Sequence, residues 1–121
     1  IMATLTPKLT LTSSDTSTDS LALEVTDTLT VTTPMIDVAR VTLSTSTTDL
    51  VGTGNSSIAY LYAKNTDSTQ TVVLQQTADA KDFADLSPGE FCFFPVKGAK
   101  GVRAKSAAST AILEYGYWTK G

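Results

Sequence analysis

The alternation of apolar residues with threonine in the first part of the chain most limits what it can fold into. A period of two places successive side chains on opposite faces of an extended chain, so it predicts strands with one buried and one solvated face. Threonine supports this, because its branched Cβ favours strands over helices. The sequence contains 22 Thr. The apolar residues of the run are Leu5, Leu9, Leu11, Leu21, Leu23, Val25, Leu29 and Val31.

Polar and proline signals divide this N-terminal run. The polar stretch Ser13–Ser20 separates two strands and indicates a loop between them. Pro34 ends the second strand, because proline cannot donate a hydrogen bond to a ladder. A third strand at Ile36–Ser44 changes its apolar phase from even to odd positions, which predicts a β-bulge near Ala39 and Arg40.

The rest of the chain shows a regular succession of short strands and turns. Thr45–Ser57 reads as a loop, and two later turns carry proline or glycine where a reverse turn needs them, at Ser87–Glu90 and Lys97–Gly101. The first two of the remaining strands read as a hairpin around Asn65–Ser68. The predicted strands are Ile58–Lys64, Thr71–Gln76, Glu90–Val96, Val102–Ala107 and Thr110–Trp118.

Residues Ala78–Leu86 are the one segment whose spacing suits something other than a strand. Asp79, Asp82 and Asp85 recur every third residue, which favours a short helical turn or an irregular crossover. The three carboxylates could supply oxygen ligands for calcium, but they match no EF-hand spacing. A solvated crossover is the favoured explanation.

Together these patterns predict an all-β fold, a single-domain antiparallel β-sandwich or jelly roll of about eight short strands. The domain covers residues 1–121, with 1–20 as an extended N-terminal arm and loop.

The chain lacks the side chains on which most enzyme sites depend. It has no histidine and a single cysteine, Cys92, which excludes a Ser-His or Cys-His nucleophile, a zinc site and an intrachain disulfide. Glu90 and Glu114 could form an acid pair of the glycosidase type, or could be ordinary surface carboxylates. We expect no catalytic activity, no cofactor and no metal.

Charge also limits the partners. The net charge is −3, so the chain is not suited to holding a phosphate backbone, and we expect no nucleic-acid partner. No apolar run reaches the ~20 residues that span a bilayer, so we expect no membrane partner. Lys97, Lys100, Arg103 and Lys105 lie close together in sequence, either as a solvated hairpin tip or as a patch for an acidic partner.

The N-terminal strands carry little protection against pairing with other chains. Between Leu21 and Val31 there is no lysine, arginine or proline, the residues that usually blunt a free strand edge. Such an edge can pair with a neighbouring chain by β-augmentation, or be buried against the same chain. The predicted assembly contacts are Thr4, Leu5, Thr6, Leu9, Leu11, Leu21, Leu23, Val25, Leu29 and Val31.

Aromatic residues gather in the second half of the chain. On the last strand Tyr115 and Tyr117 share one face and Trp118 takes the other, and Tyr60 and Tyr62 share a face of their strand. These rings can fill the core, or stack on sugars and anchor an interface where they are exposed.

Three segments of the second half carry a family resemblance. They are the strand and turn from Ile58 to Asp67, the turn and apolar strand from Asp85 to Val96, and Leu113-Glu-Tyr-Gly-Tyr-Trp118. Together they resemble small virion structural proteins of tailed bacteriophages, in particular capsid decoration or cement proteins. The resemblance covers about half the chain, carries no catalytic motif and transfers no functional residues.

The resemblance implies a β-sandwich on the capsid surface that binds the major capsid protein lattice and stabilises the head, often as a homotrimer. It also implies synthesis in the host bacterial cytoplasm, which agrees with an N-terminus that lacks a charged start and an apolar segment. The alternative function is a carbohydrate-binding or adhesion module of a phage fibre or tail, suggested by the aromatic residues of the last strand.

Overall fold

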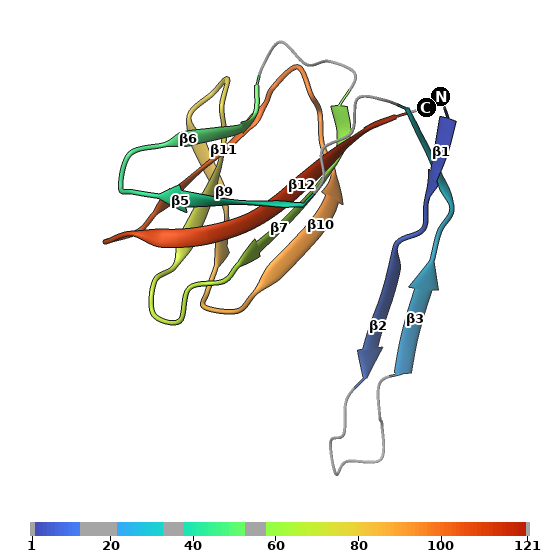
Figure 1. The fold of residues 1–121 in the computed structure, drawn as a ribbon, viewed down its shortest axis with the longest axis horizontal. Helices are drawn as coiled ribbons and strands as arrows, with labels where there is room; N and C mark the ends of the chain where they lie inside the picture. The colour runs from blue at the N-terminus through green and yellow to red at the C-terminus, as the bar shows by residue number, and fades with distance from the viewer. Residues whose placement is uncertain (1, 13–21, 33–37, 53–57, 121) are drawn as a thin grey trace.

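The computed structural model describes residues 2–12, 22–32, 38–52 and 58–120 (Figure 1), and these residues form twelve strands and no helix. The predicted all-β class is confirmed. The strands are β1 (Met2–Leu5), β2 (Lys8–Thr12), β3 (Ala22–Thr26), β4 (Leu29–Thr32), β5 (Ala39–Leu43), β6 (Thr48–Val51), β7 (Ile58–Asn65), β8 (Val72–Gln76), β9 (Lys81–Leu86), β10 (Phe91–Pro95), β11 (Val102–Ser106) and β12 (Ala111–Lys120).

The strands form two main sheets and one separate ribbon, and all the pairings are antiparallel. The six-stranded sheet has the order β1-β4-β12-β7-β10, with β5 also paired to β12. The four-stranded sheet has the order β6-β11-β8-β9, and β2 pairs with β3 alone. The long strand β12 therefore organises the larger sheet, because β7 pairs along one side of it while β5 and β4 share the other.

The core lies between the two main sheets, as a sandwich requires. It is built from the inward-facing positions of each strand, and Leu61 and Leu113 of the larger sheet meet the same cluster as Leu74 and Ala104 of the smaller one. All four are fully buried. Alternate residues of β7, β8 and β11 are buried in this way, which is the period-two pattern expected for half-buried strands.

The N-terminal strands project from this body as an arm (Figure 1). β1 and β4 pair next to the end of β12, and the chain then continues into the β2–β3 ribbon, which extends away from both sheets. Pro7 lies between β1 and β2, and its carbonyl accepts a hydrogen bond from the amide of Asp27 at 3.2 Å. The ribbon thus draws on residues 8–12 and 22–26, on both sides of the loop predicted at Ser13–Ser20, which itself lies outside the described residues.

Two predictions for residues 36–57 are wrong. The bulge expected near Ala39 and Arg40 is not there, because β5 pairs with β12 in continuous register from Ala39 to Leu43. Val38 lies before the first residue of the strand, so it takes no part in the alternation of apolar residues along β5. Ile36 lies outside the described residues. The loop predicted at Thr45–Ser57 also contains a strand, β6.

Most of the segment Ala78–Leu86, which was expected to be a helical turn or a crossover, is strand β9 (Lys81–Leu86), and a turn at residues 77–80 precedes it. It pairs with β8 with a shift of register, so that Leu74 faces Ala84 but Gln75 faces Asp82. The residue left over is Phe83, which occupies a β-bulge. This extra residue disturbs the alternation of apolar positions, which is why the sequence did not show a strand here.

The predicted hairpin between Ile58–Lys64 and Thr71–Gln76 is also wrong. β7 belongs to the six-stranded sheet and β8 to the four-stranded sheet, so the chain crosses between layers here. Asn65 fixes this crossing, because its fully buried side chain donates to the carbonyl oxygens of Gln70 and Leu86 at 2.7 and 2.9 Å. The same side chain accepts a bond from the amide of Asp67 at 3.0 Å.

Candidate assembly surface

The β2–β3 ribbon, called the arm ribbon below, is amphipathic. Register places Leu9 opposite Val25 and Leu11 opposite Leu23, so that all four side chains lie on one face. These four aliphatic side chains are 41–51% exposed. The opposite face is polar and carries an ion pair between Lys8 and Glu24, with the lysine Nζ 3.6 Å from a carboxylate oxygen. The arm ribbon therefore presents one apolar face that the chain itself covers only in part.

A second apolar surface lies on the outer face of the six-stranded sheet and is called the aromatic face below. β10 alternates, turning Phe94 inward against the core and Phe91 and Phe93 outward. Phe93 stacks on Tyr60 of β7 with ring centroids 6.2 Å apart and an interplanar angle of 9°. It also meets Trp118 of β12 at 6.2 Å, and Phe91 remains 62% exposed.

The arm ribbon and the aromatic face enclose a groove of about 550 Å³ between them, called the arm groove. The arm contributes chiefly aliphatic side chains to it and the sheet chiefly aromatic ones. The groove is lined by Leu5, Pro7, Lys8, Leu9, Val25, Asp27, Val38, Tyr62, Phe91, Phe93 and Trp118. Two apolar surfaces of one chain thus face each other across an open space.

Gly116 lies beneath two residues that line the sheet side of this groove. It lies on β12 opposite Tyr62. A Cβ added at Gly116 would meet the Trp118 ring at 3.4 Å and a methyl group of Val38 at 3.5 Å. These are ordinary van der Waals distances, so Trp118 and Val38 lie close over Gly116, where they complete the apolar lining.

A polar network adjoins the aromatic face. The Tyr62 hydroxyl donates to a carboxylate oxygen of Glu114 at 2.9 Å, and the other oxygen of Glu114 lies 3.6 Å from Nε of Arg40. Burial raises the pKa of Tyr62, and the bond to the Glu114 carboxylate raises it further. At neutral pH Tyr62 is therefore a hydrogen-bond donor that holds Glu114 against the sheet.

The carboxylates considered for chemistry have structural partners. Glu90 accepts a bond from the amide of Ser87 at 2.6 Å and closes the Ser87–Glu90 turn, while Glu114 bonds to Tyr62 and Arg40. The three aspartates of Ala78–Leu86 diverge, because Asp79 pairs with Lys100 and Asp82 accepts a bond from Gln75. Within the described ranges, no group of three or more His, Cys, Asp or Glu side chains is arranged to hold a metal ion.

Cys92 faces inward on β10 and packs against the core. Burial raises the pKa of the Cys92 thiol to about 11, so the thiolate is scarcely populated at neutral pH.

The structure divides the predicted assembly contacts into three groups. Leu9, Leu11, Leu23 and Val25 come together on the exposed face of the arm ribbon. Leu5 and Leu29 are half-buried and Val31 is buried, while Thr4 and Thr6 are exposed. Leu21 lies outside the described residues.

Sequence reasoning missed the sheet side of the arm groove. Phe91 and Phe93 stand in the run Phe91-Cys92-Phe93-Phe94, where every position is apolar, so alternation does not show which side chains face outward. Tyr115 and Tyr117, by contrast, pack against the core, which is one of the two roles that their shared face of the strand left open.

The arrangement was compared with known proteins in three ways. No protein-family model, no curated protein and no solved structure matches the chain. Among the residues that the structure describes, no helix is both long enough and apolar enough to cross a membrane.

Proposed function

We propose that this chain is a structural subunit that acts by binding, and specifically a capsid decoration or cement protein of a tailed bacteriophage. In this proposal the sandwich sits on the capsid surface as a homotrimer, and the arm ribbon reaches a neighbouring major capsid subunit. The observation that carries the proposal is the exposed apolar face of the arm ribbon, Leu9, Leu11, Leu23 and Val25. The resemblance of the segments between Ile58 and Trp118 to decoration proteins supplies the choice of partner.

The energetics of the arm ribbon favour a binding role. Full burial of one such aliphatic side chain contributes about 1.5–3 kcal/mol. The four side chains keep 41–51% of their surface exposed, so covering the rest would add about 3–5 kcal/mol. A two-stranded ribbon standing alone is only marginally stable in water, so a partner that covers this face would also hold the ribbon in place.

The test removes the apolar character of the face and leaves the sandwich untouched. The variant Leu11→Thr/Leu23→Thr introduces β-branched, strand-compatible side chains on a ribbon that makes no pairing with either main sheet. The matched control is Ile112→Thr, which alters an apolar side chain of similar exposure, 42%, on β12 outside the arm groove. Both proteins are mixed with phage heads that lack the subunit, and binding is measured by co-sedimentation.

We expect the double variant to bind heads about 10- to 30-fold more weakly, because half-burial of each leucine is worth about 1 kcal/mol and 1.4 kcal/mol is a factor of ten. The control should bind as the wild type does. Unchanged binding by a folded double variant would refute the role of the arm, and the absence of any binding by the wild type would refute the capsid assignment.

The aromatic face supports a second candidate function, carbohydrate binding. Phe91, Phe93 and Trp118 form a contiguous aromatic surface, and such surfaces stack on sugar rings. A glycan array probed with the wild type and with Phe91→Ala separates the two functions. Binding to host glycans that is lost in Phe91→Ala supports adhesion, and a blank array counts against it.

A further inference from the structure

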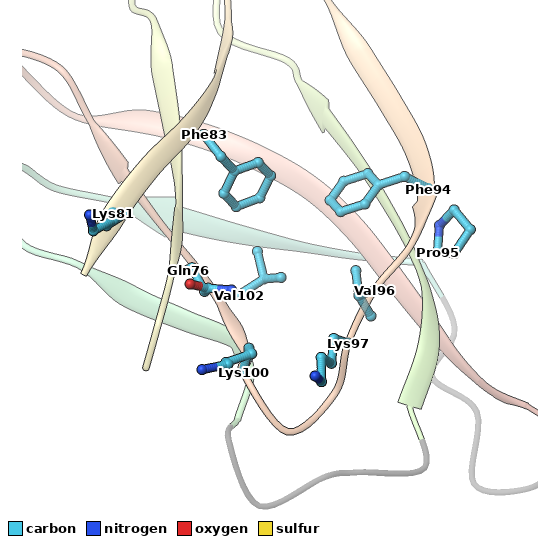
Figure 2. Close-up of a pocket in the computed structure, with 10 residues that line it drawn as sticks. Gln76, Lys81, Phe83, Phe94, Pro95, Val96, Lys97, Lys100 and Val102 are labelled. Atoms are coloured by element: carbon cyan, nitrogen blue, oxygen red, sulfur yellow. The ribbon is translucent and has the colours of Figure 1, made fainter. Parts of the chain in front are cut away.

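A second cavity, of about 260 Å³, lies on the side of the sandwich where β9 and β10 form the free edges of the two sheets (Figure 2). It is called the lysine pocket below. Phe83 and Phe94 form one end, Lys97 and Lys100 stand at the other, and Lys81 lies at one side, on β9. Val96 and Val102 line the interior between them. The cavity therefore combines an apolar floor with a cationic rim.

The apolar end of the lysine pocket is built by the bulge in β9. The extra residue, Phe83, turns toward Phe94 of the opposite sheet, and the two rings meet edge to face with centroids 5.8 Å apart and an interplanar angle of 78°. Phe83 is still 49% exposed, so the pair leaves ring surface open to an occupant. The bulge in β9 thus supplies the aromatic side chain that forms one wall of the pocket.

The cationic rim comes from the turn between β10 and β11. The amide of Lys100 donates to the carbonyl of Lys97 at 2.9 Å, and Gly101 ends the turn with φ of +71°. This tight turn places both lysines beside the pocket, and Lys81 joins them from the start of β9. The sequence patch of Lys97, Lys100, Arg103 and Lys105 is therefore divided, because Arg103 instead donates to the side-chain oxygen of Gln75.

Positive charge gathers around the lysine pocket, although the net charge of the whole chain is −3. Lys100 has one carboxylate partner, with its Nζ 3.5 Å from an oxygen of Asp79. Among the described residues, no carboxylate lies within 4 Å of Lys81 or Lys97. The ammonium groups of Lys81 and Lys97 therefore line an apolar cavity without a carboxylate partner. This combination attracts a ligand in which an anion is joined to an apolar group.

We propose that the lysine pocket binds the carboxyl-terminal residue of a partner polypeptide when that residue is aromatic or branched aliphatic. In a terminal residue the carboxylate and the side chain leave the same Cα, so both fit a cavity of single-residue size. The side chain packs on Phe83 and Phe94, and the carboxylate is held by Lys81 and Lys97. Capture of a terminal carboxylate is a recurring mode of peptide recognition. This site shares no lining residue with the arm groove, so it does not rest on the proposed function.

The experiment is a nuclear magnetic resonance titration of the full ¹⁵N-labelled chain with the acetylated tripeptide Gly-Gly-Phe, either as the free acid or as the amide. We expect the acid to shift the backbone amides of Phe83, Phe94 and the Lys97–Gly101 turn. Amidation removes the charge that the lysines bind, and should weaken binding at least fivefold.

Two variants with matched controls locate the site. Lys81→Gln/Lys97→Gln should weaken binding of the acid about fivefold, in keeping with exposed ion pairs. Lys105→Gln, a change of the same chemistry on β11 outside the pocket, should leave it unchanged. Leu11→Thr/Leu23→Thr should also bind the tripeptide as the wild type does. A negative result for the lysine pocket can therefore be told apart from a negative result for the arm ribbon. Equal binding of acid and amide, unaffected binding in the double lysine variant, or no shift at the pocket would overturn the proposal.

Discussion

Asn65 offers the sharpest test of how the two sheets are held together. Its side chain is fully buried and bonds to the carbonyl oxygens of Gln70 and Leu86 and to the amide of Asp67. Its own backbone amide donates to the carbonyl of Glu90 at 2.9 Å. One amide side chain therefore ties the end of β7 to the crossover that follows it and to the end of β9. Replacing it should loosen the sandwich at the point where the layers are joined.

The expected size follows from the bonds that are lost. Each intramolecular hydrogen bond contributes about 1 kcal/mol net, so Asn65→Ala, which removes three, should lower the free energy of unfolding by about 3 kcal/mol. Asn65→Asp keeps the acceptor for Asp67 but directs a carboxylate oxygen at the two carbonyl oxygens. Burial and these neighbours would raise the pKa of the introduced carboxyl above the usual value of about 3.9.

The raised pKa gives Asn65→Asp a distinctive dependence on pH. A carboxyl whose pKa is higher in the folded than in the unfolded state favours folding at low pH, and this contribution is lost as pH rises through the raised pKa. Relative to wild type at the same pH, Asn65→Asp should therefore be least destabilised near pH 4 and most destabilised at neutral pH.

Urea denaturation followed by Trp118 fluorescence measures both effects, with Ser68→Ala in the same exposed turn as the control, expected within about 0.5 kcal/mol of wild type. A loss below 1 kcal/mol in Asn65→Ala would refute the reasoning. So would a destabilisation by Asn65→Asp that does not change with pH.

Two further predictions concern backbone strain and the thiol. Gly101→Ala should destabilise the fold by more than Gly89→Ala, because both glycines have positive φ but only at Gly101 would a Cβ approach a backbone oxygen, at 2.8 Å. We expect about 1 kcal/mol for Gly89→Ala and at least twice that for Gly101→Ala by thermal denaturation, and equal losses would contradict the clash. Cys92, with a pKa of about 11, should react with iodoacetamide at pH 8 far more slowly than the same thiol in urea, as followed by mass spectrometry. Equal rates in the two conditions would show that the thiol is not shielded.

The fold class could be predicted because its signals are local. Alternation in the N-terminal half and the turn at Ser87–Glu90 depend only on neighbouring residues, and Gly89 takes the positive φ of +83° that such a turn requires. The assignment of strands to sheets could not be read in the same way. Asn65 looks like an ordinary turn residue in sequence, yet its buried contacts send the next strand into the other layer.

The candidate sites were predictable to different extents for the same reason. Leu9, Leu11, Leu23 and Val25 follow a clean alternation, so their common face was visible before the structure. The lysine pocket was not, because it depends on a bulge at Phe83, and a bulge removes the periodicity by which a strand is recognised.

The strand edges of the molecule bear on the proposal that it associates through its arm. Three free edges of the sandwich are irregular: β9 is bulged at Phe83, β6 is bulged where its pairing with β11 skips Leu50, and β10 ends in a proline, whereas β5 pairs with β12 in continuous register. Bulges and prolines are the devices that keep sheets from pairing with their neighbours. The β2–β3 ribbon has neither, because its register runs unbroken from Lys8 to Thr12, and its apolar face stays exposed. This contrast supports the proposal that the chain associates through its arm. The experiments at Leu11 and Leu23 therefore bear on function more directly than any change in the core.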